Sequence, residues 1–342
     1  MVSEKNRALF EFFAVFEIVN IASSIVTNLL LVYLILHRSS REIGAYRYLL
    51  LAFAINDIWF PIVHFLTLPV ICTYKDAFVM FSHGILSSRF SISLFGTTFS
   101  QTMPLLAHLF IYRLIATKWP RHLQFYSARS CILLVTITLG VEFTLWFLNS
   151  YYGYGSDLES RDYVQPFLDE EFEGDGKEFI GALYYNSEGN IRMKALLATM
   201  GFNAMMAFFM AIIVFCCCSI VLYFRSVNLE RSDATKKLQK QLFYILVVQM
   251  IFPMLFVCFP CAGVINFPLL GLPISLFPNL VSASLTIFPL MDALIIMLGV
   301  KSYRHTLFHF FKYRSTMAVI GVSNSHSHTI KVGTSMTSSS RL

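Results

Sequence analysis

Seven hydrophobic stretches, each long enough to cross a lipid bilayer, account for most of this chain. A membrane-spanning helix needs about 20 mostly apolar residues, because each residue advances only ~1.5 Å through a hydrocarbon core ~30 Å thick. In hydrocarbon the backbone polar groups must be satisfied within the segment, so each stretch is predicted to be a helix. Only 13% of the residues are charged, whereas soluble domains carry about 25%. The predicted spans are 14–36, 48–72, 90–116, 131–151, 196–224, 242–262 and 274–299.

The basic residues predict the orientation of these spans. Connections 37–47, 117–130 and 225–241 lie on one side of the membrane together with the tail 300–342. With Arg113, which ends the third span, they hold 18 of the 26 Lys and Arg residues, and the other side holds 8. The positive-inside rule therefore places the tail in the cytoplasm and the N-terminus outside. Because only a short polar segment precedes the first span, that span is expected to serve as the signal-anchor.

The pattern predicts three regions along the chain. Residues 1–300 form a seven-transmembrane domain. Residues 301–314 form an amphipathic helix on the membrane surface, because their apolar residues fall mainly on one helical face. Residues 315–342 are Ser- and Thr-rich and are predicted to be disordered. The longest outer connection, 152–195, contains 10 Asp and Glu against 4 Lys and Arg, so it is an acidic outer loop.

The motifs of common enzymes are missing from the sequence. It contains no glycine-rich phosphate loop, no His-Glu-x-x-His metal motif and no Gly-x-Ser-x-Gly nucleophile elbow, so we expect no enzymatic activity, no cofactor and no metal. The basic residues are scattered over four connections, which argues against nucleic-acid binding. Cys258 and Cys261 lie inside a hydrophobic span and are interpreted as packing residues. A disulfide from Cys72 to either of them on the outer side stays open.

Polar residues inside the spans are the first candidates for function, because they are expensive in lipid. Asn28, Asp57 and Asp292 are predicted to lie at one depth, ~10–14 Å from the cytoplasmic edge by helical rise. Two nearby carboxylates do not both stay ionised unless a cation or a donor lies between them. Two interpretations remain open: a polar switch that holds a sodium ion or a shared proton, and a static clasp between helices.

Other polar residues in the spans give weaker signals. Glu142, near the middle of the fourth span, either lines a ligand cavity or pairs with a hydroxyl group on a neighbouring helix. Hydrogen bonds to neighbouring helices are enough to explain His64, His108 and Gln101. Glu17 is predicted to reach the membrane surface and to need no function.

Prolines interrupt the last two spans. Pro253 and Pro260 lie in the sixth span, and Pro278 and Pro289 lie in the seventh. Each removes a backbone donor and permits a kink, so a kinked sixth helix beside a basic loop is a plausible moving part. Prolines are also frequent in membrane helices without any such role.

Several short motifs occur in order along the whole chain. They are GAYRYL at 44–49, IYRLIA at 111–116, LQKQLF at 238–243, Gln249 with Pro253, FPLMD at 288–292 and YR at 303–304. With these motifs the chain resembles the nematode seven-transmembrane serpentine chemoreceptors of the Str superfamily (Str or Srj class), a G-protein-coupled receptor family. The fold that this resemblance implies is an all-α seven-helix bundle with its N-terminus outside and a short amphipathic helix after the last span.

The resemblance also implies a function. Such a receptor detects a small, often volatile odorant at the plasma membrane, in the sensory cilium of a neuron, and signals through a heterotrimeric G protein. The carried-over roles are an inter-helix polar network like that of rhodopsin-like receptors for Asn28, Asp57 and Asp292, and a G-protein-facing position for Tyr112, Arg113, Lys236 and Lys237.

A ligand pocket is expected in the outer half of the bundle, between the third, fifth, sixth and seventh spans. The chain contains 34 Phe and 14 Met, which suit a dry pocket for an apolar molecule. For any single residue, ordinary packing or contact with lipid is the competing explanation. The candidate ligand-binding residues are Thr98, Gln101, Met205, Phe209 and Phe256.

Two other functions were weighed against the receptor. An ion channel or transporter needs a polar path through the bilayer, and only Asp57, Glu142 and Asp292 are acidic and well inside the spans, which is too few to line one. A non-signalling, receptor-like trafficking partner is hardly distinguished from a receptor by sequence, but it predicts normal location without a ligand response.

Overall fold

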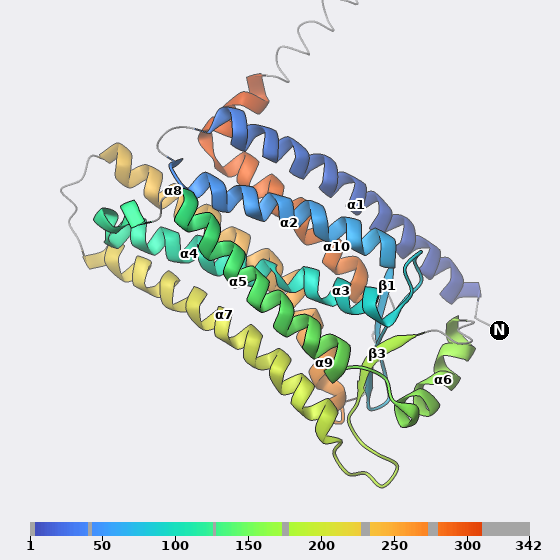
Figure 1. The fold of residues 1–342 in the computed structure, drawn as a ribbon. Coiled ribbons are helices and arrows are strands. Elements are labelled where there is room, and N and C mark those ends of the chain that lie inside the picture. The colour runs from blue at the N-terminus through green and yellow to red at the C-terminus, as the bar shows by residue number, and fades with distance from the viewer. Residues whose placement is uncertain are drawn as a thin grey trace, which may run out of the picture.

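The computed structural model describes residues 4–39, 43–125, 128–172, 178–226, 233–272 and 280–309. It is a bundle of long helices with a small sheet at one end (Figure 1). The elements in chain order are α1 (Glu4–Arg38), α2 (Tyr46–Thr67), β1 (Pro69–Tyr74), β2 (Ala77–Ser82), α3 (Arg89–Ser100), α4 (Thr102–Lys118), α5 (Ala128–Leu148), α6 (Leu158–Phe172), β3 (Phe179–Leu183), α7 (Met193–Ser226), α8 (Asp233–Pro253), α9 (Phe259–Leu269) and α10 (Leu280–Gly299).

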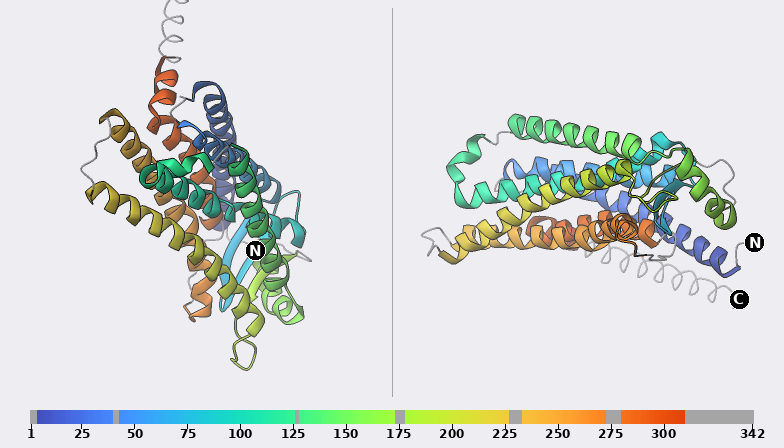
Figure 2. Two further views of the ribbon diagram at one scale, coloured as in Figure 1. Left: turned by 60° about the vertical axis from the view of Figure 1, so that its left-hand side comes forward. Right: turned by 90° about the horizontal axis from the view of Figure 1, so that it is seen from below.

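The seven-span bundle expected from hydropathy is confirmed. Within the described residues, six helices are long and apolar enough to cross a membrane: α1, α2, α5 with its π-helical extension, α7, α8 joined to α9, and α10. The pair α3 and α4 occupies the predicted third span, 90–116. Helix α1 packs on α2 and α10, and α4 packs on α7. We call the end that carries the sheet and α6 the sheet end, and the opposite end, where residues 301–309 lie, the tail end (Figures 1 and 2).

The third span is two helices rather than one. The chain breaks at Gln101, between α3 and α4. Pro104 has no amide hydrogen to offer the carbonyl of Ser100, so the regular ladder is interrupted there. The amide of Leu105 then donates to the carbonyl of Gln101 at 3.3 Å, which restarts the helix. The break lies in the middle of the bundle, close to Glu142 of α5.

The sixth span is irregular where its prolines predicted a kink. A π-helical segment, Met254–Cys258, separates α8 from α9, and Pro253 and Pro260 flank it. The amide of Phe259 donates to the carbonyl of Met254, a bond one residue longer than that of an α-helix. Such segments redirect a helix and mark functional positions in many proteins. The two halves of this span therefore meet at a built-in discontinuity.

A three-stranded antiparallel sheet corrects the prediction for the second span. That span was expected to continue to residue 72, but α2 ends at Thr67 and residues 69–72 belong to β1. Leu68 adopts a left-handed conformation, with φ of 37°, and the following Pro69 disfavours helix at the residue before it. The strand order is β1-β2-β3. The acidic outer loop thus contributes α6 and β3 to an ordered cap.

Both faces of the sheet are covered. Ile71, Phe78 and Met80 pack into the helix bundle, whereas the alternate residues, among them Cys72 and Val79, pack against α6. Successive side chains on a strand point to opposite faces, so Cys72 is turned away from Cys258 and Cys261. All seven cysteines lie in described parts of the chain and are free. The bridge that the sequence left open is not formed.

The tail end continues beyond α10. Residues 301–309 are helical, and the hydroxyl of buried Tyr303 lies 2.7 Å from that of Ser39. Leu307 packs on the main core, whereas Lys301 and Arg304 are exposed, as an amphipathic helix requires. The rest of the predicted surface helix and the Ser- and Thr-rich tail, 310–342, lie outside the described residues. The boundaries 301–314 and 315–342 stay predictions.

The close packing of the sheet gives a testable consequence at Gly181 in β3. A Cβ there would lie 2.2 Å from the carbonyl oxygen of Phe78 in β2, so the strands would have to separate. We expect Gly181→Ala to destabilise the fold by about 1–3 kcal/mol, the usual range for overpacking. Melting of the purified protein, followed with a thiol-reactive dye that reports the buried cysteines, measures the change.

Gly140 of α5 supplies the matched control for this substitution. A Cβ at Gly140 meets no described atom within 4 Å, and alanine is about 1 kcal/mol better than glycine in a helix. Gly140→Ala should therefore melt at or slightly above the temperature of the natural protein. Equal melting temperatures for the two variants would contradict the assigned strand packing.

Candidate functional site

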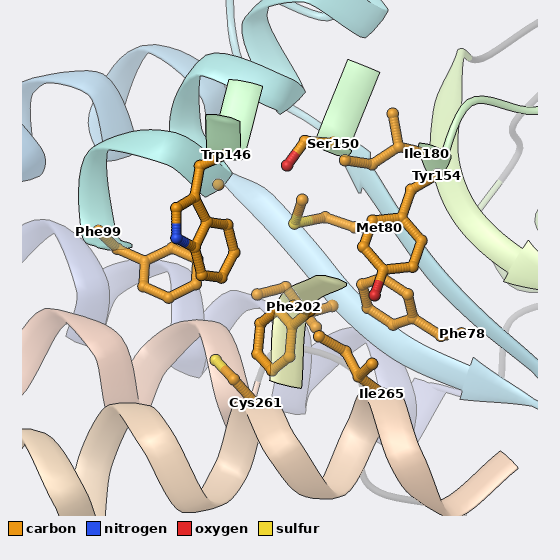
Figure 3. A pocket seen from close by; sticks show the side chains of 12 residues that line it. Phe78, Met80, Phe99, Trp146, Ser150, Tyr154, Ile180, Phe202, Cys261 and Ile265 are labelled. Carbon is orange, nitrogen blue, oxygen red and sulfur yellow. The ribbon is translucent and has the colours of Figure 1, made fainter. Parts of the chain in front are cut away.

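An aromatic cavity lies at the sheet end, enclosed by four spans and the sheet (Figure 3). Three rings from different helices form one side: Phe99 of α3, Trp146 of α5 and Phe202 of α7. Trp146 stands edge-on to Phe202 at 5.0 Å and to Phe99 at 5.9 Å between ring centroids. The remaining lining residues come from the sheet, from α3, from the π-helical segment after α5 and the residue that follows it, and from α9: Ile71, Phe78, Met80, Gly96, Ser150, Tyr154, Ile180, Cys261 and Ile265.

The cavity is small as it stands. Its volume is about 30 Å³, which is room for one or two water molecules rather than for a typical ligand of several hundred Å³. Its lining is nearly all apolar, so it favours an apolar guest over water. Met80 projects into it (Figure 3), and a methionine side chain adapts its shape easily. Any guest larger than a few atoms has to displace lining side chains.

A cluster of hydroxyl groups closes the cavity on one side. The Tyr154 and Tyr184 hydroxyls lie 3.1 and 2.7 Å from Oγ1 of Thr199. The hydroxyl of Tyr184 also donates to the carbonyl of Ile265 in α9 at 2.7 Å. Burial raises the pKa of both tyrosines, so they remain neutral hydrogen-bonding groups at physiological pH. This cluster ties the cap to α7 and to the sixth span.

The sixth span forms one side of the cavity, next to its discontinuity. Cys261 and Ile265 of α9 line the cavity and lie just beyond the π-helical segment. Asn266 of α9 and Asn203 of α7 exchange side-chain hydrogen bonds of 2.7 and 3.1 Å. A guest that pushes on α9 therefore acts directly on the helix that carries the discontinuity.

None of the five residues predicted to bind ligand lines this cavity. Thr98 is buried, and its hydroxyl donates to the carbonyl of Phe95 at 2.8 Å. The amide of Gln101 donates to Glu142. Met205 packs beside the cluster that surrounds the cavity, Phe209 belongs to the core nearer the tail end, and Phe256 stacks on Phe252 within its own span. Their roles stay predictions.

The predicted polar network joins the spans pairwise rather than as one cluster. Nδ2 of Asn28 donates to the carbonyl of Pro289 at 3.0 Å, which links α1 to α10. Nε2 of Gln249 in α8 donates to both oxygens of Asp292, at 3.0 and 3.1 Å. The carboxylate oxygens of Asp57 are buried and have no hydrogen-bond partner among the described residues. Gln249 was not among the predicted network residues; the signal that could have found it is an uncharged polar residue in the middle of a span.

Two buried contacts involve residues that the sequence treated as minor. Glu17 was expected at the membrane surface, but it is buried, and its carboxylate lies 3.2 Å from Nε2 of His64. The hydroxyl of Ser282 is 3.4 Å from the same nitrogen. Glu142 accepts from the side-chain amide of Gln101, at the break in the third span. The Gln101 amide is thus one partner of Glu142, and the hydroxyl of Ser100 on the same neighbouring span is a second.

At the tail end, Arg113 of α4 joins three spans. Its guanidinium lies over the ring of Tyr46 in α2, 4.0 Å from the centroid, and its Nη1 donates to the side chain of Gln239 in α8 at 3.2 Å. Tyr112 packs beside Tyr46 with ring centroids 5.3 Å apart.

Two of the residues predicted to face a G protein are buried, and the side chains of the other two are not described. Arg113 and Tyr112 are only 3% and 4% exposed, so neither is open to a partner in this arrangement. Lys236 and Lys237 belong to α8, but their side chains lie outside the described part of the chain. Contact of all four residues with a G protein stays a prediction.

Comparison with known proteins agrees with this architecture. The serpentine receptor class r-10 of Caenorhabditis elegans is 26% identical over 86% of this chain and 89% of its own length. Serpentine receptor class J-38 of the same nematode is 26% identical, over 85% of this chain and 91% of its own. The G-protein coupled receptor str-33, also from C. elegans, is 25% identical over 84% and 88%.

A family model covers almost all of the described helices. The model of the serpentine type 7TM GPCR chemoreceptor Str matches residues 13–308, from α1 to the helix that follows α10. Members of such a family are multi-pass membrane receptors that in general bind a small molecule and work with a G protein. The chain therefore belongs to the Str family of serpentine seven-transmembrane G-protein-coupled chemoreceptors.

Proposed function

We propose that this chain is an olfactory-type receptor that binds a small, volatile, apolar molecule in the aromatic cavity and activates a heterotrimeric G protein at its tail end. It acts in the plasma membrane of a sensory cilium, with the sheet end outside the cell and the tail in the cytoplasm. The chain acts as a receptor rather than as an enzyme, and the family assignment supports that choice. The proposal rests on the observation that one span lines the aromatic cavity at the sheet end and also contacts Arg113 at the tail end.

That span is formed by α8 and α9. Cys261 in the cavity lining and Gln239 beside Arg113 are 22 residues apart, or roughly 30 Å by helical rise. The π-helical segment and its two flanking prolines lie between them. A displacement of α9 by a guest is therefore passed to α8 through the one irregular part of the span, where a change of direction costs little.

The hydrogen bond between Gln239 and Arg113 at the tail end is the contact that activation is expected to break. Gln239 is neutral, so its hydrogen bond to Arg113 is weaker than a bond between two charged groups. Nε and Nη2 of Arg113 have no hydrogen-bond partner among the described residues. Outward movement of α8 breaks the contact and frees the guanidinium for a G protein. A ligand drives this change only if it binds the open arrangement more tightly than the closed one.

Gly96 of α3 allows the cavity to be tested. A Cβ there makes only ordinary contacts, 3.6 Å from Met80 and 3.7 Å from Ser150, so Gly96→Val adds bulk to the cavity without a backbone clash. We expect this variant to need at least about tenfold more agonist, a loss of ~1.4 kcal/mol in binding. An agonist taken from an odorant panel, with calcium release through a promiscuous G protein, provides the readout.

Gly140→Val is the control, since it places the same side chain on α5 where no described atom lies within 4 Å. It should respond as the natural receptor does. If Gly96→Val kept full sensitivity at equal surface expression, the ligand would have to bind elsewhere.

Substitutions at Gln239 test the release of Arg113. Gln239→Ala removes the acceptor and should raise ligand-independent signalling, whereas Gln239→Glu makes a charge-assisted bond to Arg113 and should lower it. Arg113→Ala should abolish coupling while agonist binding survives. Basal and agonist-driven calcium responses measure all three, with Lys118→Ala, an exposed charge at the end of the same helix, as the control. Identical basal signals in the two Gln239 variants would refute a holding role for this contact.

Terminal tags test the orientation. An N-terminal epitope should bind antibody on intact cells, and a C-terminal epitope only after permeabilisation, because 18 of the 26 basic residues lie on the tail side and basic loops stay in the cytoplasm. Detection of both tags under the same condition would contradict the seven-span topology. Detection of the N-terminal tag only after permeabilisation would reverse the proposed orientation.

A further inference from the structure

A second hollow lies at the tail end, far from the aromatic cavity. It is a groove of about 580 Å³ between α8, α10 and the helix of residues 301–309. This volume is within the range of small-molecule sites in proteins. The groove belongs to neither the odorant site nor the Arg113 contact, because Gln239 and Arg113 are not among its lining residues.

The rim of the groove is cationic. Lys240 of α8 and Arg304 of the last helix are both exposed and line it. Nη1 of Arg304 donates to the carbonyl of Leu298 at 3.2 Å. This bond uses one of the five N–H donors of the guanidinium. The Lys240 ammonium is 6.0 Å from the ring centroid of Phe224, at the limit of a cation–π contact. Among the described residues that line the groove, none is acidic.

The deeper wall of the groove is apolar and faces outward from the bundle. Tyr244 and Val248 are 66% and 40% exposed. With Ile251 of α8 and Leu255 of the π-helical segment they form an outward stripe. The opposite face of α8 is buried in the core. In a helix that crosses a membrane, an exposed apolar stripe faces hydrocarbon. A cytosolic protein does not reach such a surface, whereas a lipid lies against it.

The groove changes from charged to apolar along its length, in the same order as a lipid molecule changes from head group to acyl chain. Lys240 and Val248 are eight residues apart, or about 12 Å along the helix. Charge lies at the end nearer the membrane surface, and apolar side chains lie deeper. This order matches a phosphate head group followed by the first part of its acyl chains.

The floor of the groove is fixed by close packing. A Cβ at Gly299 of α10 would lie 2.6 Å from Cγ1 of Ile245, so glycine is what allows α8 and α10 to approach. The side chain of Gln241 donates to the carbonyl of Gly299 at 2.7 Å. The groove is therefore a formed site on this face of the bundle rather than a gap between loosely packed helices.

We propose that this groove binds an anionic phospholipid, with its phosphate between Lys240 and Arg304 and its upper acyl chain along Tyr244 and Val248. The cytoplasmic leaflet carries such lipids, so its assignment to that leaflet depends on the proposed orientation, although the binding itself does not. A lipid held here bridges α8, the span that carries Gln239, to α10. It stabilises the position of α8 that this structure has.

Native mass spectrometry of the purified full-length receptor tests the proposal, with short-chain phosphatidylserine and phosphatidylcholine as the two probes. Each cation near a membrane surface contributes about 1 kcal/mol, or roughly fivefold in affinity. We expect the double variant Lys240→Ala with Arg304→Ala to lose about 25-fold in phosphatidylserine binding. The natural receptor should prefer phosphatidylserine to phosphatidylcholine, and the double variant should lose this preference.

Two controls make the result specific to the groove. Lys118→Ala with Arg225→Ala removes two other exposed cations, at the ends of α4 and α7, and should bind phosphatidylserine as the natural receptor does. Lys240→Arg with Arg304→Lys keeps both charges and should retain binding. An equal loss in the Lys118 and Arg225 variant would reduce the effect to general surface charge and overturn the proposal, and so would unchanged binding by the first double variant.

A soluble head group separates a lipid site from a free-anion site. Glycerophosphoserine has the same charged groups without acyl chains, so it should compete weakly with phosphatidylserine. Competition at equal concentration would contradict the acyl-chain contact and leave only an anion site. Receptor dimers that dissociate in the double variant and form without lipid would mean that a second copy occupies the groove, which also overturns the proposal.

Discussion

The requirement that every backbone group in hydrocarbon find a partner governs this structure. It forces seven helical spans. Each departure from regular helix frees backbone groups, which then need other partners. The third span breaks where Pro104 removes a donor. The sixth span absorbs its prolines in a π-helical turn, in which Phe259 bonds to the carbonyl of Met254. These two departures from regular helix lie in the spans that the proposed signalling route uses. The sheet forms beyond the ends of the helices.

Hydropathy was enough to predict the bundle, but not the cap. The run Val70, Ile71, Cys72 is apolar throughout because the sheet is covered on both faces, so it looks like the continuation of a membrane helix. One local signal of a helix end was present, because Leu68 precedes a proline, but it was outweighed by the apolar content. The positive φ of 48° at Lys75, at the tip of the hairpin, is not indicated by its residue type. Strand pairing with β3, about a hundred residues away, cannot be read from local pattern.

Three of the four spans expected around a pocket, the third, fifth and sixth, line the aromatic cavity, but the fourth lines it in place of the seventh. Depth along a helix follows from counting at ~1.5 Å per residue, which is why Asn28, Asp57 and Asp292 were grouped; the structure places Asn28 against α10 and Asp292 against α8. Counting residues does not give the rotation of a helix about its axis when all its faces are apolar, so it does not show which side chains face the cavity. Thr98 was therefore proposed where its neighbour Phe99 lines the cavity, and Glu17 was assigned to the surface although it lies against His64.

The small size of the cavity bears on how such a receptor is activated. A guest has to open the space by moving lining side chains, and the apparent affinity falls by the fraction of time that the open form exists. Cys261 and Ile265 of α9 are part of that lining, so opening the cavity requires α9 to move. Ligand binding is therefore coupled to the position of the sixth span. Such coupling is reciprocal. In the proposed function, a G protein that holds α8 outward at the tail end therefore enlarges the population of open cavities, and it raises the affinity for the ligand without touching it.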